Sequence, residues 1–376
     1  MQTREKNAKP HLVYVLPYAE RGGTEAHVGQ LLAGLGDRYR LSLLAPWGEG
    51  LGALTAIPGV RHHAFPRWDR QPVQGVRALW QRVRSIHHQE PIDLIHVHAA
   101  AELLVLLRGA LPKVPLVLTV HGYHTVDRQF SYWLAAQLAR WTGAQVVTVC
   151  AAEYNHLAAC GLPGSHLQLI ANGVAELTPE PSAVAAWQEQ CGFWGPSEFV
   201  LGTAARLVPI KGLRFLLMAC AQLHREFPQL RLVVAGSGAQ KDELQALSEN
   251  LGIADRVQFV GHTDRLAALM TWFDVFALPS LQEAASLACL EAMALGKAVI
   301  ATEVGGTAEQ VLVGATGLLV PPGDVPALVT QLRFCLENPD LVRQMGANGR
   351  QRYREFFTLE SMLARTADLY RSVLNP

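Results

Sequence analysis

Several features that would point to other classes of protein are missing from this sequence. It has no Asp-x-Asp pair, so it lacks the usual acidic clamp for a metal ion and a diphosphate. Its six cysteines form no C-x-x-C pair, which disfavours zinc and redox motifs and suits reduced, buried thiols. Its most apolar long stretch, residues 103–120, is interrupted by two basic residues and two prolines, so it cannot cross a bilayer as one helix. We therefore expect no metal ion, no other cofactor and no membrane-spanning segment.

The sequence also shows no segment typical of export. The apolar run Leu12–Leu16 is too short for the hydrophobic part of a signal peptide and is better explained as a first strand. Together with the scattered cysteines, this predicts a cytoplasmic protein. Any membrane contact would then be peripheral, on the cytoplasmic face of the inner membrane.

Length and composition predict a globular protein with two domains. The chain has 376 residues, of which half are hydrophobic and 17% are charged. Its formal net charge is zero, so we expect no nucleic-acid partner. Residues 1–170 nevertheless carry 16 basic against 11 acidic side chains, a surplus of 16 − 11 = 5. This half could face an acidic acceptor or an anionic membrane, or the asymmetry could be a chance property of solvated surfaces.

Short apolar runs alternate with helix-like segments, which predicts an α/β fold with doubly wound parallel sheets. We expect strands at His11–Leu16, Leu41–Ala45, Leu94–Val97, Leu116–Val120, Val146–Val149 and Leu167–Ile170, and then at Phe199–Thr203, Leu232–Ala235, Val257–Val260, Val275–Leu278, Ala298–Ala301 and Gly317–Val320. The proline- and glycine-containing residues 177–198 are the expected linker. The sequence thus predicts a first Rossmann-like domain at 1–176, a second at 199–357, and a C-terminal helix at 358–376 that packs back on the first domain.

Two predicted loops carry charged side chains suited to a diphosphate and its sugar. Arg206 and Lys211 lie five residues apart between a strand and a helix, and two cations so placed can hold a diphosphate. Glu283 and Glu291 flank the start of a helix whose free N–H groups make an anion site. Carboxylates beside an anion site suit a ligand with both a diphosphate and hydroxyl groups, such as a nucleotide sugar. The simpler alternatives are solvated loop cations and an internal salt bridge.

Three histidines lie at predicted strand ends. His96 and His98 have strand spacing, so both rings point to one side, and His121 ends the next strand. They could bind zinc, but no acidic or cysteine ligand is near them in sequence. We therefore expect them to hydrogen-bond or to line a pocket rather than to hold a metal ion.

Glycine loops give weaker signals. Gly22-Gly23 follows the first strand and Gly236 follows a later one, and each would let backbone approach a ligand or only form a tight turn. The Gly236-Ser-Gly238 loop is a poor dinucleotide fingerprint, because Lys241 occupies the third glycine position. A nicotinamide-dependent oxidoreductase is a further hypothesis, although its fingerprint is missing from the sequence.

The combination of these landmarks resembles the retaining glycosyltransferases of family 4, also described as glycosyl transferases group 1, which have the two-domain GT-B fold. The matching segments, in order along nearly the whole chain, are 22–25, 93–98, 119–122, 170–174, 206–212, 236–238, 257–261, 283–294, 305–306 and 317–321. The two glutamates eight residues apart, together with the Arg/Lys loop, are the specific part. The resemblance implies two Rossmann-like domains that face each other across a cleft.

The resemblance also implies roles for individual residues. Arg206 and Lys211 would neutralise the diphosphate of a nucleotide-sugar donor, Glu291 would bind the ribose, and Glu283 would lie near the donor sugar and the reacting centre. The donor would contact, in addition, Gly22, Gly23, His121, Gly236, Val260, Ala285, Ser286 and Leu287. The acceptor, a glycan or a lipid-linked molecule, would occupy the first domain's side of the cleft. The implied activity is metal-independent hexosyl transfer in cell-surface polysaccharide or glycolipid synthesis.

One departure from the family pattern leaves a second function open. The family often has glycines after the first glutamate, where this chain has Ala284-Ala285-Ser286, and alanine resists positive φ. The N–H cradle could then be shaped differently, with the Ser286 hydroxyl assisting. A non-catalytic nucleotide-sugar or glycan-binding protein with the same fold is the alternative, although such a protein need not keep all four charged residues.

Peripheral membrane attachment is a separate hypothesis. The segments Val73–His88 and Phe130–Trp141 have basic residues or aromatic residues interleaved with apolar ones, and basic amphipathic helices can lie on anionic membranes. Ordinary core-facing helices with solvated arginines are the simpler explanation.

Overall fold

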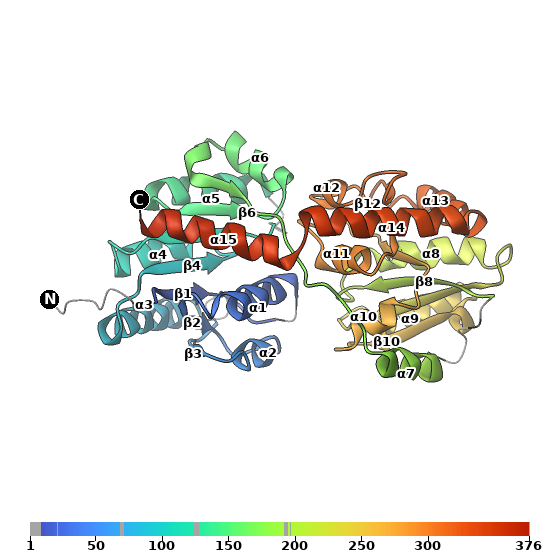
Figure 1. Ribbon diagram of the computed structural model, residues 1–376, viewed down its shortest axis with the longest axis horizontal. Helices are drawn as coiled ribbons and strands as arrows, with labels where there is room; N and C mark the ends of the chain where they lie inside the picture. Colours follow the sequence, from blue (N-terminus) through green and yellow to red (C-terminus); the bar gives the residue numbers. More distant parts are fainter. Residues whose placement is uncertain are drawn as a thin grey trace. The chain divides into compact units, whose positions relative to one another are not determined.

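The computed structural model describes residues 9–20, 22–67, 71–122, 128–191, 195 and 197–375. Internal contacts divide the chain into two compact units (Figure 1). The first unit contains Met1–Asn172 together with Glu360–Pro376, and the second contains Gly173–Leu359. Each unit has its own parallel sheet and its own hydrophobic core.

The first unit is built on a seven-stranded parallel sheet of order β3-β2-β1-β4-β5-β6-β7. Its strands are β1 (His11–Val15), β2 (Arg40–Ala45), β3 (Val60–Ala64), β4 (Leu94–His98), β5 (Leu116–Val120), β6 (Gln145–Thr148) and β7 (Leu167–Leu169). Its helices are α1 (Gly23–Leu35), α2 (Leu51–Thr55), α3 (Pro72–Gln89), α4 (Leu103–Ala110), α5 (Arg128–Thr142), α6 (Ala151–Ala159) and α15 (Leu359–Leu374), with a short 3₁₀ turn at Gly164–His166. The central strands β1, β4 and β5 are buried along their whole length, as expected for strands covered by helices on both faces.

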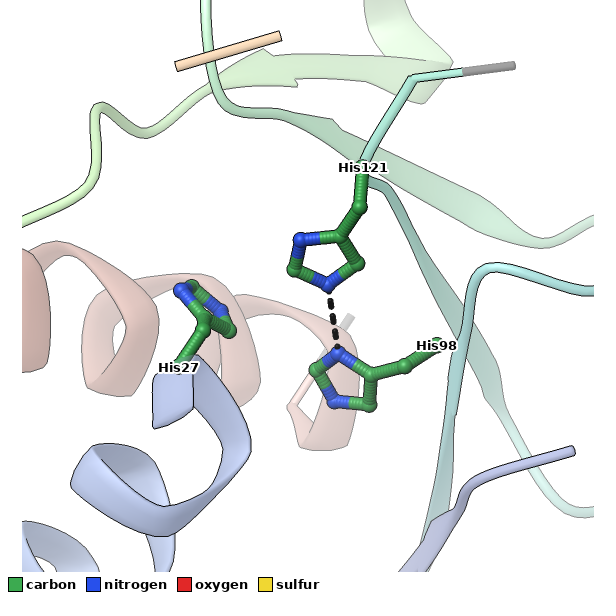
Figure 2. Close-up of side chains that lie close together, drawn as sticks. All are labelled: His27, His98 and His121. Carbon is green, nitrogen blue, oxygen red and sulfur yellow. Dashed lines mark hydrogen bonds between the residues drawn. The ribbon is translucent and has the colours of Figure 1, made fainter. Parts of the chain in front are cut away.

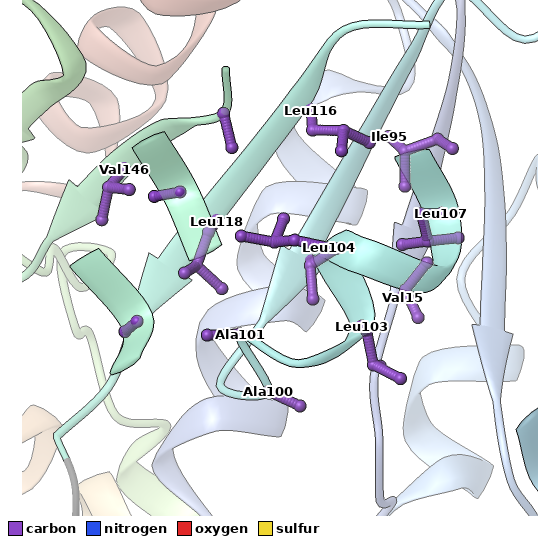
Figure 3. Close-up of a cluster of buried hydrophobic side chains, with 14 of the residues drawn as sticks. Val15, Ile95, Ala100, Ala101, Leu103, Leu104, Leu107, Leu116, Leu118 and Val146 are labelled. Atoms are coloured by element: carbon purple, nitrogen blue, oxygen red, sulfur yellow. The ribbon is translucent and has the colours of Figure 1, made fainter. Parts of the chain in front are cut away.

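Helices α3, α4 and α5 cover one face of this sheet. In Figure 3 the α4 side chains of Leu103, Leu104 and Leu107 lie over strand residues that include Ile95 and Leu118. Such close-packed branched side chains exclude water from the sheet, which is the main source of stability for the unit.

The C-terminal helix α15 is joined to the first sheet by a buried polar contact. The hydroxyl of Tyr370 lies 2.9 Å from the hydroxyl of Tyr14 on β1 and 2.5 Å from Nδ1 of His96 on β4. Because these polar atoms are buried, their mutual hydrogen bonds are needed to offset the loss of water. The last helix is therefore an integral part of the first unit.

The second unit is built on a six-stranded parallel sheet of order β10-β9-β8-β11-β12-β13. Its strands are β8 (Phe199–Ala204), β9 (Leu230–Ala235), β10 (Val257–Gly261), β11 (Val275–Leu278), β12 (Ala298–Thr302) and β13 (Gly317–Val320). Its helices are α7 (Pro181–Cys191), α8 (Leu213–Leu223), α9 (Lys241–Asn250), α10 (Leu266–Met270), α11 (Leu287–Ala294), α12 (Thr307–Gln310), α13 (Val325–Glu337) and α14 (Pro339–Phe356), with 3₁₀ turns at Pro209–Lys211 and Ala254–Arg256. The strand order reverses between β8 and β11, and ligands of such sheets bind beyond the carboxyl ends of the strands at this reversal.

The predicted α/β fold with two doubly wound parallel sheets is confirmed, and all six strands expected after residue 198 are present. Strand β3 was missed. Its sequence, Val-Arg-His-His-Ala, is polar because β3 forms the edge of the sheet and is only partly buried. Residues 177–198, expected to be the linker, include α7, which belongs to the second unit; residues 192–194 and 196 lie outside the described residues.

The helices of the described ranges include none that is both long enough and apolar enough to cross a membrane.

Candidate active site

Two loops of the second unit meet where its strand order reverses. The first loop follows β8 and carries Arg206, which is exposed, and Lys211, which ends a 3₁₀ turn. The second loop follows β11 and carries Glu283. A backbone hydrogen bond of 2.7 Å from Leu281 N–H to the Ile210 carbonyl joins the two loops. Residues 281 − 210 = 71 positions apart in the sequence are thus joined by a backbone hydrogen bond.

Lys211 and Glu283 form an ion pair between these loops. Nζ of Lys211 donates to Oε2 of Glu283 at 2.5 Å, and the two side chains are only 17% and 13% exposed. The Ser280 hydroxyl donates to the same carboxylate oxygen at 3.2 Å. A charge-assisted bond with so little water around it is strong, so the ammonium group is held at one position above the sheet edge. The sequence predicted both charged residues, and the ion pair fits the internal salt bridge that it left as the simpler alternative for the glutamates. It did not predict that Lys211 would be the partner of Glu283, nor the contact of Ser280.

The segment Ala284-Ala285-Ser286 leads from this ion pair into α11. The Ser286 hydroxyl accepts a hydrogen bond of 3.3 Å from Cys289 N–H and therefore caps the helix, rather than leaving a free hydroxyl for a ligand. In the described part of the chain, only one non-glycine residue, Ala99, has a positive φ, so Ala284 and Ala285 have ordinary backbone conformations. The two alanines are accommodated without strain, and Ala285 and Leu287 lie beside the start of α11.

The glycine that this loop requires lies elsewhere in the sequence. Gly305 has a φ of +53°, and a Cβ atom at that position would be 1.8 Å from the carbonyl oxygen of Glu283. The neighbouring Gly306 N–H donates to the Ala284 carbonyl at 2.6 Å. The backbone of 305–306 therefore packs directly on the backbone of the glutamate loop and fixes its course.

Glu291 lies in the second turn of α11, mostly buried. Burial raises the pKa of its carboxyl group to about 7, and among the described residues no charged group offsets this effect. A carboxyl group in such surroundings lacks the hydrogen-bond donors that would stabilise its charge. Hydroxyl groups of a ligand could supply them.

The remaining residues predicted in this unit lie at its other strands. Gly236 follows β9, and a Cβ there would be 1.9 Å from the carbonyl oxygen of Ala205, so packing against the Arg206 loop already explains the glycine. Val260 lies on the edge strand β10 and lines a pocket with α7 residues, including Trp187. In the sheet, β9 and β8 separate Val260 from β11.

In the first unit, α1 begins at two glycines. Gly22 occupies the N-cap position without a side-chain cap, and Gly23 is the first helical residue. A Cβ atom at Gly23 would meet no atom of the described residues within 4 Å. Packing therefore does not require glycine at 23, which leaves room beside this residue for a ligand.

His121, at the end of β5, lies in a cluster of histidines (Figure 2). Nε2 of His121 is 3.1 Å from Nδ1 of His98, and both rings approach His27 of α1. Nδ1 of His27 donates to Oδ1 of Asn172 at 3.1 Å. Burial lowers the pKa of His27 to about 4 and holds the pKa of His98 and His121 well below the usual range, so all three imidazoles are neutral at pH 7.

Sequence reasoning missed two members of this group, His27 and Asn172, which come from other elements. The prediction that His96 and His98 point to one side is confirmed, since their ring centroids lie 4.1 Å apart. The ring nitrogens of His96, however, hydrogen-bond Tyr370, as described above, and the Thr119 hydroxyl at 2.7 Å. No spacing in the sequence links residues 27, 98, 121 and 172, because only the parallel order of β1, β4 and β5 brings their loops to one edge.

Two family models match the chain. "Glycosyltransferase Family 4" matches residues 21–176, and "Glycosyl transferases group 1" matches residues 193–352. The chain is 30% identical over 288 residues to the glycogen synthase of Mycobacterium tuberculosis, covering 74% of this chain and 68% of that protein. It is 29% identical over 368 residues to a GDP-mannose-dependent alpha-(1-6)-phosphatidylinositol monomannoside mannosyltransferase of Mycolicibacterium smegmatis, covering 93% and 94%.

A solved structure has the same fold. The crystal structure of Anabaena Alr3699/HepE in complex with UDP-glucose superposes with a TM-score of 0.84, at 24% identity, covering 96% of this chain and 99% of that one. The two sheets are those of the GT-B class of glycosyltransferases, as predicted. The chain belongs to glycosyltransferase family 4 and is a glycosyltransferase.

Proposed function

We propose that this protein is a retaining hexosyltransferase that moves a sugar from a nucleotide-sugar donor to a glycan or lipid-linked acceptor. The observation that carries the proposal is the Lys211–Glu283 ion pair, held beside the start of α11 with the partly buried Glu291 one turn further along. This arrangement offers a cation and helix N–H groups to a diphosphate, and carboxylates to hydroxyl groups. A nucleotide sugar carries both kinds of group.

Transfer at this site would depend on stabilising the leaving group. As the anomeric C–O bond breaks, negative charge grows on the diphosphate and the sugar gains oxocarbenium character. Arg206, Lys211 and the N–H groups of α11 would stabilise that charge, so we propose that the reaction needs no metal ion. For same-face attack, the leaving phosphate would accept the proton of the acceptor hydroxyl, and we assign no protein residue as the base. Glu283 would contact the hydroxyls of the donor sugar.

The remaining contacts would come from the first unit and from the helix start. Gly22 and Gly23 would bring backbone N–H groups to a phosphate or sugar, and His121 would line the sugar site. We also propose that the backbone of Ala285 and Leu287 contacts the diphosphate. Ser286 contributes through its cap of α11, and Gly236 through the position of the Arg206 loop.

The names of relatives suggest two candidate donors. The mannosyltransferase relative is named for GDP-mannose, and HepE was solved with UDP-glucose. We propose that the product is a cell-surface polysaccharide or a glycolipid, made in the cytoplasm. A lipid-linked acceptor would require the protein to reach a membrane.

Helix α5 is the surface we propose for that contact. Phe130, Trp133 and Trp141 are 54%, 49% and 68% exposed, and Phe130 stacks on Trp133 at 5.8 Å. Exposed aromatic rings of this kind favour the interface between lipid and water. Helix α3, the other candidate, buries one face in the core as α5 does, but its exposed large apolar side chains, Val73 and Val76, are not aromatic. Failure of the protein to co-sediment with anionic vesicles at low salt would contradict the contact.

A thermal-shift screen tests the donor proposal. The protein, in EDTA, is heated with UDP-, GDP-, ADP- and dTDP-sugars and with NAD, because a ligand that binds only the native state raises its Tm. We expect one nucleotide-sugar set to raise the Tm and the Arg206→Ala variant to lose that shift. A shift only with NAD would favour an oxidoreductase. A shift with no turnover in any acceptor would favour a binding protein.

A further inference from the structure

The histidine cluster of the first unit has an arrangement that its hydrogen bonds alone do not explain. One nitrogen from each of His27, His98 and His121 lies within 4.8 Å of the others, and the first two side chains are almost fully buried. Figure 2 shows the three rings gathered around one point, from α1, from the end of β4 and from the end of β5. Burying polar rings from three elements in one place costs free energy, unless hydrogen bonds or a bound ligand offset the loss of water.

The spacing of the two closest nitrogens matches that of ligands on one metal ion. Nδ1 of His98 and Nε2 of His121 are 3.1 Å apart. Two imidazole nitrogens at about 2.0–2.1 Å from a tetrahedral zinc ion lie about 3.3 Å apart. Zinc could therefore replace the proton that these nitrogens share, with little movement of either ring. The nitrogen of His27 lies within 4.8 Å of the other two, so His27 would need to approach by up to about 1.5 Å to complete a site of the dimensions that zinc requires.

His27 is oriented in the way that metal-bound histidines usually are. Its Nδ1 donates to the side-chain oxygen of Asn172, which leaves the lone pair on Nε2. A hydrogen bond of this kind to the distal nitrogen fixes the tautomer and ring orientation of zinc ligands and strengthens them as donors.

The hydrogen bonds of His98 show which nitrogen would bind the metal. Its Nε2 is buried and has no hydrogen-bond partner within the part of the chain that the structure describes, whereas Nδ1 contacts His121. Zinc would therefore bind this ring through Nδ1, and the proton of the ring would stay on Nε2.

We propose that His27, His98 and His121 form a binding site for a zinc ion, with a fourth position open to water or another ligand. Neutral imidazoles favour zinc over magnesium or calcium, which prefer oxygen ligands. This site differs from a metal–diphosphate clamp. It shares His121 with the sugar site proposed above, but zinc has no part in the proposed transfer. The test measures metal binding alone, so its failure would leave the proposed function unaffected.

Cobalt substitution tests the site directly. Tag-free full-length protein, stripped with chelator, is titrated with Co²⁺ in buffer without phosphate or nucleotide, because tetrahedral cobalt absorbs visible light strongly. We expect a band that saturates at one equivalent and disappears when one equivalent of Zn²⁺ is added. His27→Gln should weaken Co²⁺ binding at least about tenfold, and Asn172→Ala should weaken it by about 10–100-fold through loss of the orienting bond.

The matched control is His88→Gln. His88 is exposed on α3 in the same unit and should not change the titration. The absence of a saturable band in the wild-type protein, or unchanged affinity in a folded His27→Gln variant, would overturn the proposal. If the variants do not fold, zinc-edge X-ray absorption on the wild-type protein decides the question, since the site requires three imidazoles and fewer would contradict it.

Discussion

Lys211 and Glu283 are bonded to each other at 2.5 Å, although the roles proposed for them concern different parts of a donor. Without ligand, the Glu283 carboxylate neutralises the ammonium charge of Lys211 that would otherwise attract a diphosphate. Removing that competition should strengthen binding of the nucleoside diphosphate, since the ammonium group would be free to meet it. Glu283→Gln should therefore bind the nucleoside diphosphate about three- to tenfold more tightly in calorimetry, while transfer falls about 100-fold.

The control is Glu198→Gln, which breaks another half-buried ion pair of the same unit, with Arg231. It should change neither affinity nor transfer. Weaker nucleotide binding by Glu283→Gln would show that the carboxylate supports the diphosphate site rather than competing for its cation.

Glu291 gives a prediction about pH. Its pKa in the folded state, about 7, lies above the ordinary value of 4.5, so the folded state loses stability through this group as pH rises from about 4.5 to about 7. Glu291→Gln removes that loss. The Tm of the variant minus the Tm of the wild type should therefore be about 2–4 °C larger at pH 8 than at pH 5.

The protonation state of the same carboxyl group should change when the ribose of a donor binds. Hydroxyl groups that donate to the carboxylate favour its charged form, so donor binding near pH 6.5 should release protons. Calorimetry in buffers of different ionisation enthalpy measures this release, and Glu291→Gln should abolish it. Proton release that persists in the variant would assign it to another group.

Gly305 tests the backbone contact behind Glu283. Ala at this position would clash with the Glu283 carbonyl and would also adopt a positive φ. Gly314 is the matched control, because it has a φ of +74° but an open surrounding. Gly314→Ala should lower the Tm by about 2–4 °C through the backbone conformation alone. Gly305→Ala should lower it at least about twice as far and reduce kcat about tenfold or more. If Gly305→Ala and Gly314→Ala have equal effects, the packing of Gly305 on the Glu283 carbonyl does not matter for stability or transfer.

Gly23 tests the open start of α1. A methyl group there would meet nothing in the described protein, so Gly23→Ala should keep or slightly raise the Tm, since alanine favours helix. It should reduce transfer by about tenfold, because the methyl group would stand where the ligand approaches. Gly52→Ala, in α2 and also without neighbours, is the control and should leave transfer unchanged. Full transfer by Gly23→Ala would exclude a close approach at this helix start.

The fold could be predicted well from sequence because buried parallel strands are continuous apolar runs. Strands such as β11 and β12 stand out for this reason. Strand β3 does not, because an edge strand has no need of an apolar sequence. The four charged residues of the candidate site could be identified by their types and spacing. Their contacts could not.

The contacts escaped prediction because they join loops from different strands. The Lys211–Glu283 bond, the packing of Gly305 on Glu283, and the bond of His27 to Asn172 connect residues between 22 and 145 positions apart. Only the order of the strands in each sheet decides which loops meet. The alanines after Glu283 illustrate the same limit, since their ordinary φ values depend on where Gly305 lies.

Donor turnover by Lys211→Ala tests the central claim most directly. The donor identified by thermal shift is incubated in EDTA with a panel of glycan and lipid-linked acceptors, and release of the nucleoside diphosphate is followed. Lys241→Ala, which removes an exposed lysine of the same unit, is the control. We expect Lys211→Ala to keep its Tm within a few degrees and to lose transfer by about 100-fold or more, because the leaving group loses its cation. Near-normal turnover by a folded Lys211→Ala protein would contradict the proposed site.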